Sequence, residues 1–161
     1  MHRLLLFFTA ALLAGCVSSP APFSAASSQQ ALVRWSKPNN TLVSEAVFSR
    51  AADSSVRVQL YKGSPKVLVT LSLDANKKMQ ASGPMASLGW RGDAGAAPLQ
   101  LSTWSRFLQD YQAAPKWPDG DNEIHSGDSR TAVSIINRQV RSLSVSNNLS
   151  GETITAKFQA P

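Results

Sequence analysis

The chain has 161 residues, with 16 lysine and arginine residues against 10 acidic ones and a formal net charge of +6. This length suits a single domain that buries an ordinary hydrophobic core. The basic residues are scattered and no nucleic-acid-binding motif is present, so we exclude nucleic acid as a partner and attribute the positive charge to solubility or to a nearby anionic surface.

The first residues of the chain have the layout of a bacterial export signal. Arg3 gives a short positive start, and the run "LLLFFTAALLAG", Leu4 to Gly15, is apolar or small throughout. A membrane-spanning helix needs about 20 apolar residues, so this run is too short to span a bilayer but has the length of a signal-peptide core. We therefore predict a signal peptide at residues 1–15.

The single cysteine of the chain, Cys16, closes the segment "LAGC". This segment resembles the lipobox of bacterial lipoproteins, in which a leucine and two small residues precede a cysteine. The resemblance implies cleavage before Cys16, a diacylglycerol on its sulfur and an acyl chain on its new amino group. Such chains form a stable membrane anchor, since each buried CH₂ contributes about 0.8 kcal/mol. The alternative is an ordinary signal peptide with a cysteine at this position by chance.

Val17 follows the cysteine, whereas an aspartate at that place retains proteobacterial lipoproteins in the inner membrane. The resemblance therefore implies a lipid anchor in the outer membrane, with the domain expected on the periplasmic side and the cell surface as the alternative. After Cys16, the small and polar residues 17–30 predict a flexible tether. The remaining residues, 31–161, are predicted to form one β-rich domain.

Alternating apolar and polar residues predict most of the strands in this domain. The clearest pair is "SVRVQLY" and "KVLVTLSLD", which a turn at Lys62–Pro65 joins into an antiparallel hairpin. Further strands are predicted in "TLVSEAVFS" before this hairpin and at residues 78–81 after it. Toward the C-terminus, "RTAVSIINRQVRSLSVS" predicts two strands with a break at Asn137 and Arg138, and "GETITAKFQA" predicts the last one.

One amphipathic helix is predicted within "LSTWSRFLQDYQAAP", with Ser102 as its N-cap and Pro115 at its end. Its apolar residues recur at spacings of three and four and form one stripe. The stripe consists of Leu101, Trp104, Phe107, Leu108 and Tyr111. We expect this stripe to pack against the rest of the domain, and the alternative is that it forms an exposed partner-binding face. This order of elements predicts an α+β fold, in which the helix packs on one face of an antiparallel, curved sheet.

The sequence contains no pattern typical of catalysis or of a bound cofactor. His125 is the only histidine after the predicted signal peptide, and its sequence neighbours Ser126 and Asp128 do not amount to a triad. The acidic segment 119–123 lacks the ligand spacing of a calcium loop, and no His/Cys cluster supports zinc. We therefore predict a non-enzymatic protein with no catalytic residue, metal site or cofactor.

The segment "ASGPMASLGWRGD", residues 81–93, places Met85, Leu88 and Trp90 in a glycine-containing loop. Such a loop covers the end of the core, closes over an apolar cavity or protrudes toward a membrane. Its turn "SGPM" resembles that of the LolA/LolB lipoprotein carriers, whose fold is an incomplete barrel of curved antiparallel sheet. In that family helices plug an apolar cavity that holds acyl chains. The aromatic helix near the start of that family's domain has no counterpart around "ALVRWSK".

These observations lead to two hypotheses for a protein that Cys16 attaches to the membrane. The first is a non-catalytic carrier that binds an acyl chain or another apolar ligand in the LolA/LolB manner, between the sheet and the helix. The second is an interaction or assembly module that binds another envelope protein through its sheet. The residues predicted to contact the ligand or the partner are Met85, Leu88, Trp90, Trp104, Phe107, Leu108 and Tyr111.

Overall fold

The computed structural model describes residues 23–63, 66–86 and 89–160, so Cys16, the predicted signal peptide and Leu88 lie outside the described residues. Within them, ten strands form one sheet in the order β6-β5-β4-β3-β2-β1-β10-β9-β8-β7, and every pairing is antiparallel. The strands are β1 (Ser27–Lys37), β2 (Asn40–Arg50), β3 (Val56–Tyr61), β4 (Val67–Leu73), β5 (Lys78–Ser82), β6 (Trp90–Asp93), β7 (Gly120–Ser126), β8 (Ser129–Ile136), β9 (Gln139–Asn147) and β10 (Glu152–Phe158). The helices are η1 (Ala94–Ala96), α1 (Leu99–Ala113) and η2 (Ala114–Lys116).

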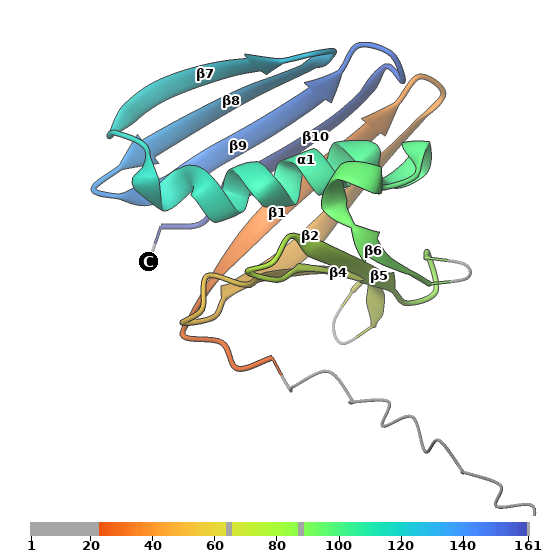
Figure 1. The fold of residues 1–161 in the computed structure, drawn as a ribbon, viewed down its shortest axis with the longest axis horizontal. Helices are drawn as coiled ribbons and strands as arrows, with labels where there is room; N and C mark the ends of the chain where they lie inside the picture. The colour runs from red at the N-terminus through yellow and green to blue at the C-terminus, as the bar shows by residue number, and fades with distance from the viewer. Residues whose placement is uncertain (1–22, 64–65, 87–88, 161) are drawn as a thin grey trace, which may run out of the picture.

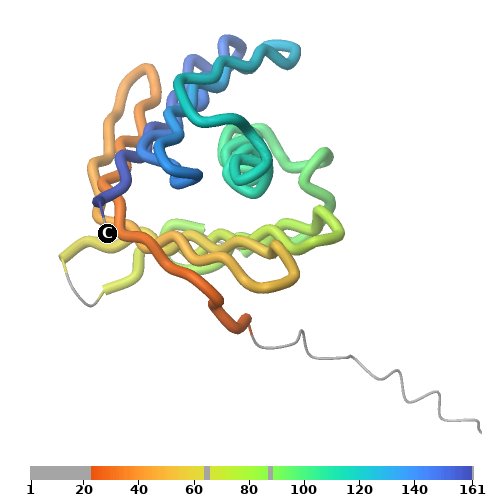
Figure 2. Tube along the Cα trace, turned by 90° about the vertical axis from the view of Figure 1, so that its left-hand side faces the viewer, coloured from red at the N-terminus to blue at the C-terminus, as the bar shows by residue number. Residues whose placement is uncertain are grey.

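The sheet curves around α1 and leaves its two edges apart. Figure 2 shows α1 end-on inside this curve, between an arm that contains β3 to β6 and an arm that contains β7 to β10. Strand β1 pairs with both β2 and β10, so the first and last strands of the chain meet in the middle of the sheet. The edge strands β6 and β7 do not pair with each other within the described residues. The result is an incomplete barrel, which we call the half-barrel.

The predicted α+β fold, with an antiparallel sheet and a single α-helix in the described part of the chain, is confirmed. The alternation in the sequence explains this agreement, because Val56, Val58 and Leu60 of β3 are fully buried while the residues between them are half-exposed. The predicted break between two C-terminal strands is a two-residue turn at Asn137 and Arg138. Their φ angles of 52° and 60° are those of a hairpin turn that matches the twist of its strands.

The structure differs from the prediction at the start of the domain and at both sheet edges. Strand β1 begins at Ser27, inside the predicted tether 16–30, because Ser27 to Gln30 pair with β2. Strand β7 lies where the sequence predicts no strand, and Trp90 belongs to the edge strand β6 rather than to a loop. No residue of the edge strand β7 is buried, so its sequence lacks the apolar alternation that reveals a strand.

The helix α1 begins at Leu99, so the prediction that Ser102 is its N-cap is wrong. The Ser102 hydroxyl instead donates a hydrogen bond to the carbonyl oxygen of Leu99 at 2.8 Å, within the first turn of the helix. Pro98 occupies the N-cap position without a side-chain hydrogen bond, and α1 ends at Ala113. Among the described residues, none of the helices has the length and apolar character needed to cross a membrane.

Candidate functional site

The interior of the half-barrel, between α1 and the concave face of the sheet, contains an aromatic cluster. Phe48 of β2 lies at its centre, with ring-centroid distances of 5.9 Å to Phe107, 5.1 Å to Tyr111 and 4.9 Å to Phe158. These separations, with the rings inclined to one another, are those of favourable aromatic pairs. The cluster therefore joins β2, α1 and the last strand, β10, into one core.

Four of the five residues of the stripe predicted on the helix are buried in this core, and the fifth, Leu101, is partly buried and packs against it. Trp104, Phe107 and Leu108 are at most 1% exposed, and Tyr111 is 4% exposed. The stripe is a packing surface, and the alternative of an exposed partner-binding face is wrong. An apolar ligand reaches these four side chains only from inside the half-barrel.

One end of the half-barrel carries a small apolar opening, which we call the mouth hollow. Its volume is about 80 Å³, and it is lined by Trp35, Lys37, Asn40, Leu42 and Met85. This end lies at the right of Figure 1, toward which both the β1–β2 turn and the N-terminal end of α1 point. The Trp35 ring meets the Trp104 ring edge-on at a centroid distance of 5.5 Å. Trp35 therefore lines the mouth hollow and also contacts Trp104.

Met85, one of the predicted ligand contacts, is 45% exposed at the rim of the mouth hollow. Its backbone amide donates a hydrogen bond to the Leu68 carbonyl oxygen at 3.0 Å. Gly83 makes this close approach possible, because its φ is +108° and a Cβ there would lie 3.0 Å from the same oxygen. Trp90, another predicted contact, is half-buried on β6 and packs against the core.

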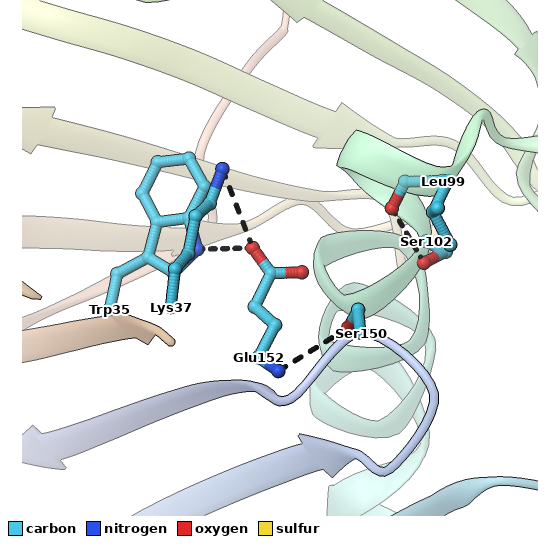
Figure 3. A network of polar contacts seen from close by, with 6 residues as sticks. All are labelled: Trp35, Lys37, Leu99, Ser102, Ser150 and Glu152. Carbon is cyan, nitrogen blue, oxygen red and sulfur yellow. Dashed lines mark hydrogen bonds and ion pairs between the residues drawn. The ribbon is translucent and has the colours of Figure 1, made fainter. Parts of the chain in front are cut away.

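A buried carboxylate holds Trp35 in position beside the mouth hollow (Figure 3). Glu152 is 3% exposed, and its Oε1 accepts a hydrogen bond from Trp35 Nε1 at 2.5 Å. The Lys37 ammonium lies 3.9 Å from the same oxygen and 4.6 Å from the centre of the Trp35 ring. A buried carboxylate needs such partners, since leaving it unpaired costs about 3–5 kcal/mol. The network therefore orients the indole that lies between the mouth hollow and Trp104.

Glu152 is not among the residues predicted from the sequence, although a signal for it exists. In "GETITAKFQA" the apolar face of the strand consists of Ile154, Ala156 and Phe158, and Glu152 continues the same alternation. A carboxylate at an inward-facing position indicates a buried group that requires a dedicated partner. Its partner, Trp35, is 117 residues away in the sequence. Only the pairing of β1 with β10 brings the two side chains together.

The polar side of α1 carries a second buried carboxylate, that of Asp110. Its Oδ2 accepts a hydrogen bond from Arg106 Nε at 2.7 Å and another from the Thr131 hydroxyl of β8 at 2.6 Å. Arg106 lies one turn earlier on the helix, so the pair is internal to α1, while Thr131 belongs to the sheet. These contacts hold α1 against β8 and give Asp110 a structural role.

At the C-terminal end of α1, Arg50 of β2 donates hydrogen bonds to the carbonyl oxygens of Tyr111, at 2.6 Å, and Gln112, at 3.0 Å. Its guanidinium also lies 4.9 Å from the centre of the Tyr111 ring. A cation at this end of a helix is favourable, because the helix dipole is negative there. Burial raises the pKa of the Tyr111 hydroxyl, and the charge of Arg50 offsets part of this rise.

The raised pKa of Tyr111 predicts a loss of stability at alkaline pH. The unfolded chain ionises Tyr111 near the ordinary pKa of about 10, whereas the folded protein keeps it neutral to higher pH. This contribution to stability is therefore complete below about pH 10 and is lost as the pH rises toward the folded pKa. Urea unfolding across this range should show a steeper decline for the natural protein than for Tyr111→Phe.

The matched control for this experiment is Tyr61→Phe, which alters the half-buried tyrosine of β3. It changes the other tyrosine of the chain, outside the aromatic cluster, so a comparison of the two variants isolates the effect of Tyr111. Equal slopes for Tyr111→Phe and the natural protein would show that Tyr111 does not govern the alkaline behaviour.

His125 lies on the exposed edge strand β7, where its Nε2 is 2.7 Å from Glu123 Oε1. Arg130 of β8 lies 2.8 Å from the same oxygen, and hydrogen bonds from Arg130 and His125 lower the pKa of Glu123. This is a solvent-exposed ion network, which contributes little to stability. In residues 23–63, 66–86 and 89–160, no group of three His, Cys, Asp or Glu side chains is placed to share a metal ion.

Three comparisons relate the chain to known proteins. No protein-family model and no curated protein matches the sequence. Among solved structures, the chain is similar to a LolA superfamily protein from Nitrosomonas europaea, with a TM-score of 0.42 and 8% sequence identity. That match covers 83% of this chain and 83% of the other.

Proposed function

We propose that this protein is a lipid-anchored protein of the bacterial envelope that binds an acyl chain or another apolar ligand inside its half-barrel, without catalysing a reaction. The observation that carries the proposal is the mouth hollow, whose lining residue Trp35 contacts Trp104 of the aromatic cluster. The resemblance of residues 13–16 to a lipobox supports the anchor at Cys16, and Val17 supports an outer-membrane location facing the periplasm.

The mouth hollow holds only about 80 Å³, so an entering acyl chain has to displace side chains at its rim. Met85 suits this role, because its unbranched, flexible side chain adapts to irregular spaces. The first turn of α1 is weakly held, since Pro98 provides no side-chain hydrogen bond to it and Leu99 is 64% exposed. Outward movement of this turn opens a path from the hollow toward Trp104.

The lining of the mouth hollow also indicates the chemistry of the ligand. Burial of an acyl chain against Trp35, Leu42 and Met85 is favourable by about 25 cal/mol per Å² of apolar surface. Among the described residues that line the hollow, Lys37 is the one cation, and its ammonium already lies 3.9 Å from the Glu152 carboxylate. The apolar side chains therefore contribute most to ligand binding, and an acyl chain such as that of a fatty acid fits this site.

The proposal is tested on the full chain purified from bacterial membranes in mild detergent. Mass spectrometry should recover lipid in addition to any chains attached to Cys16, and an apolar fluorescent probe should bind and be displaced by a fatty acid. A protein that carries no such lipid and does not bind the probe would overturn ligand binding. The mass of the N-terminal peptide shows separately whether Cys16 is acylated.

The exposed side chain of Met85 offers a specific test of the mouth hollow. Met85→Lys should weaken binding of the apolar probe about tenfold or more, because burying a methionine side chain contributes about 1.5–3 kcal/mol. The control is Leu32→Lys on the convex face, where the side chain is 51% exposed, comparable to the 45% of Met85. Fluorescence titration should show natural affinity for the control, and equal affinities for both variants would exclude this entrance.

The open edges of the sheet favour a second candidate function, an interaction or assembly module. Strand β7 pairs with β8 on one side only, and β6 pairs only with β5 within the described residues. An unpaired strand edge is able to accept a strand of another protein. Crosslinking in intact cells from a photoreactive residue at Asn122 of β7 should then recover an envelope protein. Recovery of lipid alone would favour the carrier.

A further inference from the structure

A second and larger hollow lies on the opposite, convex side of the sheet, and we call it the outer hollow. Its volume is about 760 Å³, and strands β3 to β6 contribute most of its lining. Figure 2 shows the start of the described chain running along the outer side of this arm, away from α1. The outer hollow is therefore distinct from the mouth hollow and from the aromatic cluster.

A row of four polar side chains crosses the outer hollow from strand to strand. Arg57 pairs with Ser72, Ser72 pairs with Gln80, and Gln80 pairs with Arg91 in the registers of neighbouring strands. All four line the hollow. Neighbouring strands lie about 4.8 Å apart, so the two arginines stand at the ends of a row that their long side chains span. Cations at both ends and neutral polar groups between them suit an extended anionic group.

The two arginines have hydrogen-bond donors that the protein does not use. Arg57 Nε is buried and has no hydrogen-bond partner among the described residues. Its guanidinium lies 4.1 Å from the centre of the Phe23 ring, which supports it without accepting a conventional hydrogen bond. Within the described parts of the chain, neither Arg57 nor Arg91 takes part in an ion pair. A buried donor without a partner is unfavourable, so an acceptor in the outer hollow would stabilise this arrangement.

The acidic side chains near the outer hollow are already engaged. Asp53 accepts two hydrogen bonds from Ser55, both at 2.9 Å, and the Asp74 carboxylate accepts one from the Lys78 amide at 2.8 Å. The Lys78 ammonium pairs with Asp93 at 2.6 Å. The charged residues that line the hollow therefore include Asp53 and Asp74, whose carboxylates cap turns, and Lys78, which is paired with Asp93. Among the described residues that line the outer hollow, Arg57 and Arg91 are the cations without an ion-pair partner.

The course of the N-terminal segment brings the outer hollow close to the anchor. Phe23, which stacks on Arg57, also lines the outer hollow. Phe23 lies seven positions after Cys16, and an extended chain spans at most about 3.6 Å per residue. A lipid on Cys16 therefore keeps this hollow within about 25 Å of the membrane surface.

We propose that the outer hollow binds the headgroup of an anionic phospholipid in the membrane that carries the anchor, with Arg57 contacting the phosphate and Arg91 contacting the other end of the headgroup. This inference rests on the proposed lipid anchor at Cys16. A guanidinium matches the geometry of phosphate oxygens through two parallel hydrogen bonds. Ser72 and Gln80 hydrogen-bond to the rest of the headgroup. Headgroup binding holds the convex face of the β3–β6 arm against the bilayer and sets the orientation of the domain.

The experiment compares hydrogen–deuterium exchange of the full, acylated chain in two kinds of lipid nanodisc. One contains phosphatidylcholine alone, and the other contains phosphatidylcholine mixed with phosphatidylglycerol. Backbone amides around the outer hollow, in the turns 51–55 and 74–77 and in the edge strand β6, should exchange more slowly on the anionic discs. The expected slowing is about fivefold for each arginine that meets the anionic surface. Identical exchange on the two discs would overturn the proposal.

The variant for this comparison is Arg57→Gln/Arg91→Gln, which should exchange equally on both discs. The control is Arg34→Gln/Arg130→Gln, which removes the same charge from exposed positions on β1 and β8 and should keep the difference. Loss of the difference in this control would reveal general attraction by net charge and overturn the site. The mass of the peptide that contains Cys16 shows independently whether the anchor is attached. If the chain is not acylated, an N-terminal histidine tag binds it to discs that contain a nickel-chelating lipid, and the same comparison is made.

Discussion

Replacing Phe48 by alanine is expected to lower the free energy of unfolding by about 3–5 kcal/mol. The Phe48 ring is fully buried and contacts Phe107 and Tyr111 of the helix and Phe158 of the last strand. Its loss removes apolar burial and leaves a cavity at the centre of the aromatic cluster. Since small domains are stable by only about 5–15 kcal/mol, this is the largest stability effect that we expect from a single substitution.

Urea denaturation followed by circular dichroism measures this change as a shift of the midpoint. The matched control is Val43→Ala on the same strand, where the side chain is 56% exposed on the convex face. A surface substitution of this kind changes stability by less than about 0.5 kcal/mol. Similar midpoints for the two variants would mean that Phe48 is not at the centre of a packed core.

Replacing Cys16 by serine is expected to abolish acylation of the protein and its lipid attachment to the membrane. The reason is chemical, because a serine hydroxyl cannot replace the thiol that the lipobox resemblance identifies as the site of diacylglycerol attachment. The anchor that is lost is strong, since each buried CH₂ contributes about 0.8 kcal/mol. Metabolic labelling with an alkyne fatty acid, followed by mass spectrometry of the N-terminal peptide, measures the change.

The control for the anchor is Val17→Asp, which leaves the thiol in place. This variant should incorporate the label fully, and its Asp should shift the protein from the outer to the inner membrane on a density gradient. Labelled Cys16→Ser protein would contradict the lipoprotein interpretation. An unlabelled natural protein would do the same and would favour an ordinary signal peptide.

Much of the fold is predictable from the sequence, because most elements have one buried and one exposed face. The β3–β4 hairpin follows from an alternation of period two, and α1 follows from a stripe of period 3.6. The exceptions have physical causes. Strand β7 is an edge strand without a buried residue, and the start of β1 is polar, so neither Gly120–Ser126 nor Ser27–Gln30 shows a periodic apolar pattern.

The candidate site is predictable only in part. Trp104 belongs to a stripe that periodicity reveals, and Met85 stands in a turn that its glycine and proline neighbours mark. Trp35 and Glu152 form one unit beside the mouth hollow, yet they come from opposite ends of the domain. No local pattern predicts that pair, because its two members share no stretch of chain.

The sequence by itself determined the features that depend on neighbouring residues: the apolar face of each regular strand, the stripe on α1 and the lipobox-like segment that ends at Cys16. Only the tertiary structure decided how distant strands align. The pairing of β1 with β10 creates the Trp35–Glu152 contact, and the registers of β3 to β6 place Arg57 and Arg91 in one row. The physical reason is that register depends on the packing of all the strands together, and a shift of one residue would turn every side chain of a strand to the other face.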